Sequence, residues 1–144
     1  MALLNILKHP DEFLYKTSKP VTEFNERLWS FLDDMADTLE HANGMGLASP
    51  QVGRLLRVFI LMNEEGDIIE FINPEIIESS KPKIGEEACL SAPGMPRDME
   101  RANRVRVKYQ DRIGTWFERE FFDMDAICIQ HELDHLDGKL IVDD

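Results

Sequence analysis

The chain has 144 residues, of which 43% are hydrophobic, and a formal net charge of −12. This length suits a single domain that buries about two-thirds of its unfolded surface. The negative charge disfavours direct binding of nucleic acid. The longest apolar run, Val58 to Met62, is too short to span a membrane, and the opening residues lack the pattern of a signal or transit peptide. We therefore expect a cytoplasmic protein with no membrane partner.

The first predicted element is a long amphipathic helix from about Glu23 to Ala42. Apolar residues recur there at helical spacing, namely Leu28, Phe31, Leu32, Met35 and Leu39. The helix leads into a segment from Gly44 to Gln51 that contains two glycines and an uncharged Gln. Glycines allow the backbone to approach a ligand closely, so this segment is a candidate for a binding loop.

Short strands are predicted downstream of this segment. The first two span Leu56 to Met62 and Ile68 to Ile72. Apolar and basic residues then alternate in residues 104–109, which predicts a strand that pairs, through a turn at residues 111–114, with a strand over residues 116–121. A helix follows, with Asp123 as its expected N-cap and Gly138 just beyond its C-terminus.

The last helix contains the most informative pattern of the chain, His131-Glu132-Leu133-Asp134-His135. Residues four apart on a helix are separated by about 400°, so His131 and His135 lie on one face and can bind one metal ion. Glu132 lies about 100° away, where a carboxylate can take a proton from water and later give it to a leaving amine. The pattern predicts a metal-dependent hydrolase, and the alternative is a surface helix with two solvated histidines.

Catalytic metal sites generally use three protein ligands, so a third ligand is expected. One class of protease would require a third His at the position of Ile141, and no Glu follows His135, so the ligand must lie upstream. Cys89 is a candidate in an extended segment, because a thiolate binds zinc and ferrous iron strongly. The alternative for a cysteine is a small buried hydrophobic residue, which suits Cys128 better. Without a secretion signal, neither cysteine is expected to form a disulfide.

Three motifs resemble those of the peptide deformylase family and occur in the same order. They are Gly44 to Gln51, Glu87 to Ser91, and Gln130 to Gly138, and the likeness extends to Ile6 to Asp11 near the amino end. Ser49 and Ala88 stand where the family has Ala and Gly. The resemblance implies an α+β fold in which short antiparallel strands wrap around a central metal-binding helix. It also implies that residues 1–144 form one catalytic domain, without the basic C-terminal extension of many bacterial relatives.

The resemblance further implies removal of the formyl group from the N-terminal formylmethionine of newly made polypeptides. Cys89, His131 and His135 would bind one divalent metal ion, Fe²⁺, with Zn²⁺ or Ni²⁺ as alternatives. Glu132 would act as general base and then as general acid. The side-chain amide of Gln51 and the backbone N–H of Leu90 would stabilise the negative charge that develops on the formyl oxygen.

The resemblance also implies how the peptide substrate binds. The backbone of Met45 and Gly46 would pair with the substrate like an added strand. The methionine side chain would enter an apolar pocket with Glu87 at its edge, and the candidate pocket residues are Met45, Met124, Ile127 and Cys128. For Ile127 and Cys128, ordinary burial in the core of an amphipathic helix is the alternative.

The expected partners are N-formylmethionyl peptides, and we expect a monomer. Ribosome docking is expected to be weak or absent, because the acidic Asp143-Asp144 terminus would be repelled by RNA. Two other classes compete with the deformylase interpretation. A protease that cuts internal peptide bonds would share the metal helix but lack its downstream ligand. A non-catalytic protein with a structural metal site would need a fourth ligand, and such a site would not explain the presence of Glu132 and Gln51.

Overall fold

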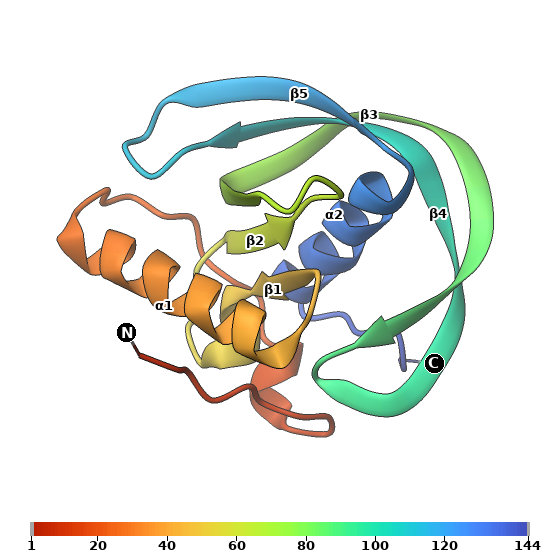
Figure 1. Ribbon diagram of the computed structural model, residues 1–144, viewed down its shortest axis with the longest axis horizontal. Helices are drawn as coiled ribbons and strands as arrows, with labels where there is room; N and C mark the ends of the chain where they lie inside the picture. The colour runs from red at the N-terminus through yellow and green to blue at the C-terminus, as the bar shows by residue number, and fades with distance from the viewer. Residues whose placement is uncertain (1, 144) are drawn as a thin grey trace.

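The computed structural model describes residues 2–143, which form a five-stranded antiparallel sheet that curves around one helix (Figure 1). The strands follow one another in the sheet in chain order, from β1 at one edge to β5 at the other. The elements are η1 (Glu12–Tyr15), α1 (Glu26–Ala42), β1 (Gly46–Ala48), η2 (Ser49–Val52), β2 (Val58–Met62), β3 (Ile68–Cys89), β4 (Ala92–Gln110), β5 (Trp116–Phe122) and α2 (Asp123–Leu136). This arrangement confirms the predicted α+β class.

Helix α1 begins three residues later than predicted. Asn25 is its N-cap, and the Asn25 side chain accepts a hydrogen bond from the Leu28 N–H at 3.3 Å. Such a cap satisfies a backbone donor that has no partner within the helix, which fixes the start of the helix. The five apolar residues that predicted this helix are all buried against one another and against β1 and β2. Asn43 then adopts a left-handed conformation, with φ 56°, and turns the chain toward Gly44.

Strands β3 and β4 are far longer than the short strands predicted. They have 22 and 19 residues, and they pair as a long hairpin from Ile72 opposite Gln110 to Cys89 opposite Ala92. The middle of this hairpin is mostly exposed on both faces, so its sequence lacks the alternation of polar and apolar residues on which strand prediction depends. The hairpin bends around α2 and ends next to it (Figure 1).

The predicted hairpin between β4 and β5 is confirmed. Tyr109 lies opposite Phe117, and the Asp111 side chain accepts hydrogen bonds from the N–H groups of Ile113 and Thr115 in the turn. Gly114 supplies the positive φ, 90°, that this turn requires. Strand β5 continues one residue further than predicted, to Phe122.

Helix α2 lies on the concave side of the sheet, where Ala126, Ile129 and Leu136 belong to the main hydrophobic core (Figure 1). Its N-cap is Phe122, so the prediction of Asp123 as N-cap is wrong. Asp123 is already the first helical residue, with φ 55°, and its carboxylate accepts a hydrogen bond from Asn103 on β4. A side chain engaged with the neighbouring strand is not available to cap its own helix.

The opposite end of α2 agrees with the sequence. Gly138 follows the helix with φ 73°, and its N–H donates to the His135 carbonyl at 3.1 Å. Arg57 donates to the Leu136 carbonyl at 3.2 Å and pairs with Asp137 at 3.1 Å, which anchors this end of the helix to the segment before β2. Among the described residues, no helix has both the length and the apolar character needed to cross a membrane.

Candidate functional site

The predicted metal ligands meet where β3 ends beside α2. Cys89 is the last residue of β3, and His131 and His135 lie one turn apart on the facing side of the helix. One candidate ligand atom from each residue lies within 4.8 Å of the others, and the Cys89 Sγ is 3.3 Å from the His135 Nε2. A thiolate and two imidazoles suit a divalent metal with borderline-soft ligand preference, and three protein ligands leave a position open. The site is therefore consistent with one divalent metal ion.

A buried network of charged side chains holds His131 in place. The Glu87 carboxylate lies 3.0 Å from the His131 Nδ1 and accepts two hydrogen bonds from the Arg101 guanidinium, at 2.8 and 3.1 Å. Arg101 also donates to Asp134 on α2 at 2.7 Å. Burial by itself would raise the pKa of Glu87, but the hydrogen bonds from His131 and Arg101 outweigh it and hold this pKa below its usual value. An ionised Glu87 fixes the imidazole so that the opposite nitrogen is free for a metal.

The two histidines differ in their electrostatic surroundings. Burial and the neighbouring His131 lower the pKa of His135 to about 3, so its imidazole is neutral, which is the form that binds a metal. Burial disfavours the charged form of His131 as well, yet the carboxylates of Glu132 and Glu87 and the thiol group of Cys89 outweigh it and raise the His131 pKa to about 10. A metal ion must therefore compete with a proton at His131.

Glu132 is buried beside the two histidines and faces the glycine-rich segment. A Cβ atom built on Gly46 would lie 2.6 Å from the Glu132 Oε2, so a larger residue there would force the Glu132 side chain to move. Glu132 is 4% exposed, and its Oε1 has no hydrogen-bond partner among the described residues. Burial raises its pKa to about 7, against the opposing effect of His131. A carboxyl group that titrates near neutral pH can both accept and release a proton under physiological conditions.

Gln51 is held with its amide aimed at the site. The Ala48 N–H donates to the Gln51 Oε1 at 2.9 Å, which leaves the Nε2 group facing Ser91 Oγ at 3.0 Å and Cys89 Sγ at 3.8 Å. Leu90 lies in the turn after Cys89, and its side chain contacts Gly44 closely enough that a Cβ atom there would lie 2.7 Å away. The glycine-rich segment and the Cys89 turn are therefore in direct contact.

The N-terminal segment links these two regions. The Leu7 N–H donates to the Gln51 carbonyl at 2.7 Å, and the His9 N–H donates to the Ser91 carbonyl at 2.6 Å. Two hydrogen bonds from one extended stretch thus fix the backbone on both sides of the Gln51 amide.

A cavity of about 490 Å³ opens onto the metal-binding residues. Most of the predicted substrate contacts line it, namely Met45, Gly46, Glu87, Met124 and Cys128. Ile127 does not, because its side chain lies against an adjoining cavity of about 400 Å³. Burial raises the pKa of the Cys128 thiol to about 12, so Cys128 is a neutral part of the wall.

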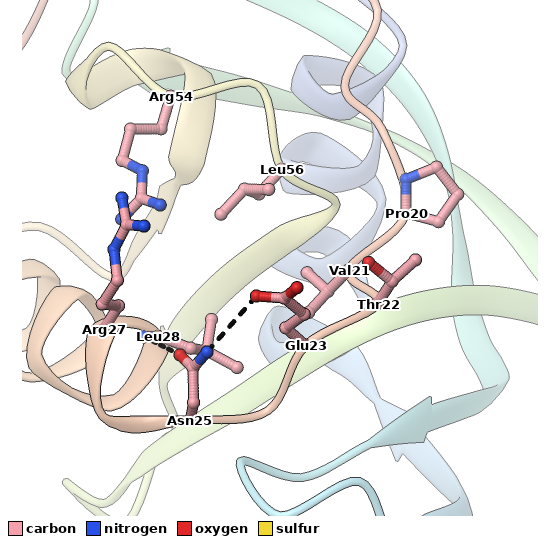
Figure 2. A pocket seen from close by; sticks show the side chains of 9 residues that line it. All are labelled: Pro20, Val21, Thr22, Glu23, Asn25, Arg27, Leu28, Arg54 and Leu56. Carbon is pink, nitrogen blue, oxygen red and sulfur yellow. Dashed lines mark hydrogen bonds between the residues drawn. The ribbon is translucent and has the colours of Figure 1, made fainter.

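A further pocket lies at the start of α1, apart from the metal-binding residues. Figure 2 shows its nine lining residues, which include Arg27 and Arg54, and the hydrogen bond that the Asn25 side chain donates to the Glu23 carboxylate at 3.4 Å. None of these residues lines the cavity at the metal site, and none was predicted to act there.

Three residues that organise the site are not indicated as such by the sequence, namely Ser91, Arg101 and Asp134. Ser91 and Asp134 lie inside the family motifs, so their position in the sequence could have indicated a role at the site. Arg101 lies in a polar stretch of β4 with no distinguishing pattern. Glu87 was predicted at the edge of the substrate pocket, and it does line the cavity, but its carboxylate is engaged with His131 and Arg101.

Comparison with known proteins is consistent with this geometry. A family model described as polypeptide deformylase matches residues 3–144. A peptide deformylase from Chromobacterium violaceum is 49% identical, with the match covering 99% of this chain and 87% of the relative. The crystal structure of a peptide deformylase from Legionella pneumophila matches with a TM-score of 0.94 and 44% identity, over 98% of this chain and 85% of that chain. A Met-Ala-Ser-bound class I type b peptide deformylase from Acinetobacter baumannii matches with a TM-score of 0.92 and 34% identity, over 98% and 97% of the two chains.

Proposed function

The chain belongs to the polypeptide deformylase family, and from this premise we propose which of its residues carry out each part of the reaction. The protein is a metal-dependent hydrolase that removes the formyl group from N-terminal formylmethionine. The proposed roles rest on the positions of the side chains around the cavity at the metal site.

Cys89, His131 and His135 would hold the metal ion. We propose Fe²⁺, with Zn²⁺ and Ni²⁺ as alternatives, because one thiolate and two imidazoles suit each of these ions. When bound, the ion supplies Lewis acidity and makes a nucleophile available at neutral pH. Glu87 would act as a positioning residue, since its carboxylate fixes the His131 ring.

Glu132 would act first as general base and then as general acid. Its carboxylate would accept a proton from the attacking water and later deliver it to the nitrogen of the departing peptide, which leaves as a free amine. The observation that carries this assignment is a buried carboxylate with a pKa near 7, lying in the cavity next to the metal ligands.

The Gln51 amide and the Leu90 backbone N–H would stabilise the charge that develops on the formyl oxygen. The hydrogen bonds from Ala48 and to Ser91 support this role for Gln51, because they orient the amide before the substrate arrives. A donor that is already oriented does not have to reorganise during the reaction, and loss of one such donor typically slows turnover about 100-fold to 1000-fold.

The peptide would bind along β1, which lies at the edge of the sheet and includes Gly46. An edge strand has unpaired backbone groups that can pair with an extended peptide. The relative that is bound to Met-Ala-Ser supports a peptide of this kind as a ligand. The methionine side chain would lie between Met45, Met124 and Cys128 and reach Ile127.

We further propose that residues 1–144 act as one catalytic domain, as a monomer in the cytoplasm. The net charge of −12 supports weak or absent docking to ribosomal RNA, because like charges repel.

The test is formate release from formyl-Met-Ala-Ser under anaerobic conditions, with the protein loaded with Fe²⁺ or Ni²⁺. We expect Glu132→Gln to slow turnover about 100-fold or more while the metal content stays unchanged, because the variant keeps the shape but loses the proton carrier. Glu100→Gln is the matched control, since Glu100 is exposed on β4 and does not line this cavity, and its rate should be that of the wild type. A Glu132→Gln variant that retains both metal and wild-type turnover would show that the assignment is wrong.

A further inference from the structure

Gly85 on β3 is a glycine that the backbone does not require. Five of the eight glycines have positive φ angles, and Gly44 and Gly46 are in close contact with Leu90 and Glu132. Gly85 has neither property: its φ lies outside the positive range, and a Cβ atom built on it would meet no atom within 4 Å. A side chain could therefore start at this position without a clash at its Cβ atom, and glycine leaves that space open.

The strand places Gly85 on the face that carries the site. Residues two apart in a strand point to the same side, so a side chain at position 85 would point the same way as the buried Glu87. Gly85 and the opposite residue, Met99, both line the cavity of about 400 Å³ that also contains Ile127. The open space at Gly85 is therefore part of this cavity.

This second cavity adjoins the one at the metal-binding residues. The two share Glu86, Glu87 and Met124 as lining residues, while Cys128 lines only the first and Ile127 only the second. A methionine side chain that contacts both Cys128 and Ile127 must therefore pass from one cavity into the other. Pockets of about 300–1,000 Å³ hold drug-sized ligands, so a cavity of about 400 Å³ offers more room than one methionine side chain needs.

We propose that Gly85 determines specificity for the first residue of the substrate. With no side chain at this position, the second cavity accepts a bulky apolar or aromatic side chain, so the enzyme also removes the formyl group from N-formyl peptides that begin with such a residue. Met99 and Met124 favour an aromatic ring there, because thioether sulfur makes favourable contacts with rings. This inference rests on the proposed path of the substrate side chain.

The experiment compares kcat/KM for formyl-Met-Ala-Ser and formyl-Phe-Ala-Ser in the wild type and in Gly85→Val. Valine favours strands and its Cβ meets open space, so the variant should fold, which its Tm will check. We expect the wild type to release formate from both peptides. In Gly85→Val we expect kcat/KM to fall about 10-fold or more for the phenylalanine peptide, and much less for the methionine peptide. Gly85→Ala should give a smaller loss with the same selectivity. Ser79→Val, on an exposed position of β3 outside both cavities, is the matched control and should leave the ratio of the two rates unchanged.

Several results would overturn the inference. If the wild type released formate from the methionine peptide but not from the phenylalanine peptide, this inference would be overturned, while the proposed function would stand. An unchanged ratio of the two rates in Gly85→Val would also overturn the inference. No release from either peptide by metal-loaded wild type would overturn the proposed function and this inference together.

Discussion

At the scale of single residues, Glu87 and Arg101 bury opposite charges that are paired with each other. Glu87 and Arg101 are each 9% exposed, and both are linked to the metal helix, through His131 and Asp134 respectively. Removing one member of a buried ion pair is strongly unfavourable, because the remaining charge loses both water and its partner. Arg101 therefore reaches the metal-binding residues only through Glu87 and Asp134, and we expect it to act on the site through them.

Replacement of Arg101 should weaken metal binding. In Arg101→Gln the Glu87 carboxylate loses its two guanidinium hydrogen bonds, so it no longer holds the His131 ring firmly. We expect metal affinity to fall about 10-fold to 100-fold, measured by titration against a competing chelator. Arg104→Gln is the control, because Arg104 pairs with Glu120 nearer the surface of the sheet. Equal affinities in wild type and Arg101→Gln would refute the positioning role.

At the scale of secondary-structure elements, contacts with neighbouring segments fix the C-terminal end of α2, the helix that carries His131 and His135. Helix α2 presents His131 and His135 only if its last turn is held, and both Gly138 and Arg57 act at that turn. Gly138 has φ 73°, and a Cβ atom on it would lie 2.5 Å from the carbonyl oxygen of Tyr15. The η1 segment thus packs directly against the residue that terminates the helix.

Gly138→Ala should destabilise the protein more than an alanine at another glycine with positive φ. Gly66→Ala is the matched control, because Gly66 has φ 87° but no atom within 4 Å of the position that the added methyl group would occupy. We expect the free energy of unfolding of the control to fall by about 1–2 kcal/mol from backbone strain alone. For Gly138→Ala we expect it to fall by about 1–3 kcal/mol more, because of the clash with Tyr15. Denaturant unfolding measures the free energy of unfolding of both variants. Equal decreases would show that the contact with Tyr15 does not add to the cost of the substitution.

The molecule as a whole brings together ligands that are distant in sequence. Cys89 and His135 are 46 residues apart, and the sheet must bend around α2 before they meet (Figure 1). The N-terminal segment completes this assembly through its hydrogen bonds to Gln51 and Ser91. A metal ion bound at these residues would join the end of β3 to α2, so we expect metal binding to be coupled to folding.

Removal of the metal should lower the thermal stability of the protein. A ligand that binds only the folded state stabilises it by about 4 kcal/mol when present at about 1,000 times its Kd. We therefore expect the Tm of metal-loaded protein to fall after chelator treatment and to recover when metal is returned, as measured by calorimetry. His135→Ala, which lacks one ligand, should show a much smaller change on chelation. A wild-type Tm that chelation leaves unchanged would contradict the coupling.

Features that depend on local geometry could be predicted from the order of the amino acids alone. The spacing of His131 and His135 placed both imidazoles on one face, because helix periodicity fixes neighbours three and four residues apart. The core of α1, strand β2 and the hairpin between β4 and β5 followed from the same kind of periodicity. The lack of a downstream ligand made Cys89 a candidate, and the family resemblance then implied roles for Cys89 and Gln51, which local spacing could not connect to the helix.

The way in which distant groups meet could not be predicted from local patterns and depends on the three-dimensional fold. The long pairing of β3 with β4 has exposed polar residues on both faces, so no local pattern indicated its length or that it brings Arg101 to Glu87. The pKa of Glu132 near 7 arises from burial beneath Gly46, and the open space at Gly85 arises from what surrounds the strand. Burial, charge pairing and cavity shape depend on contacts between residues far apart in the chain, which a one-dimensional pattern does not specify.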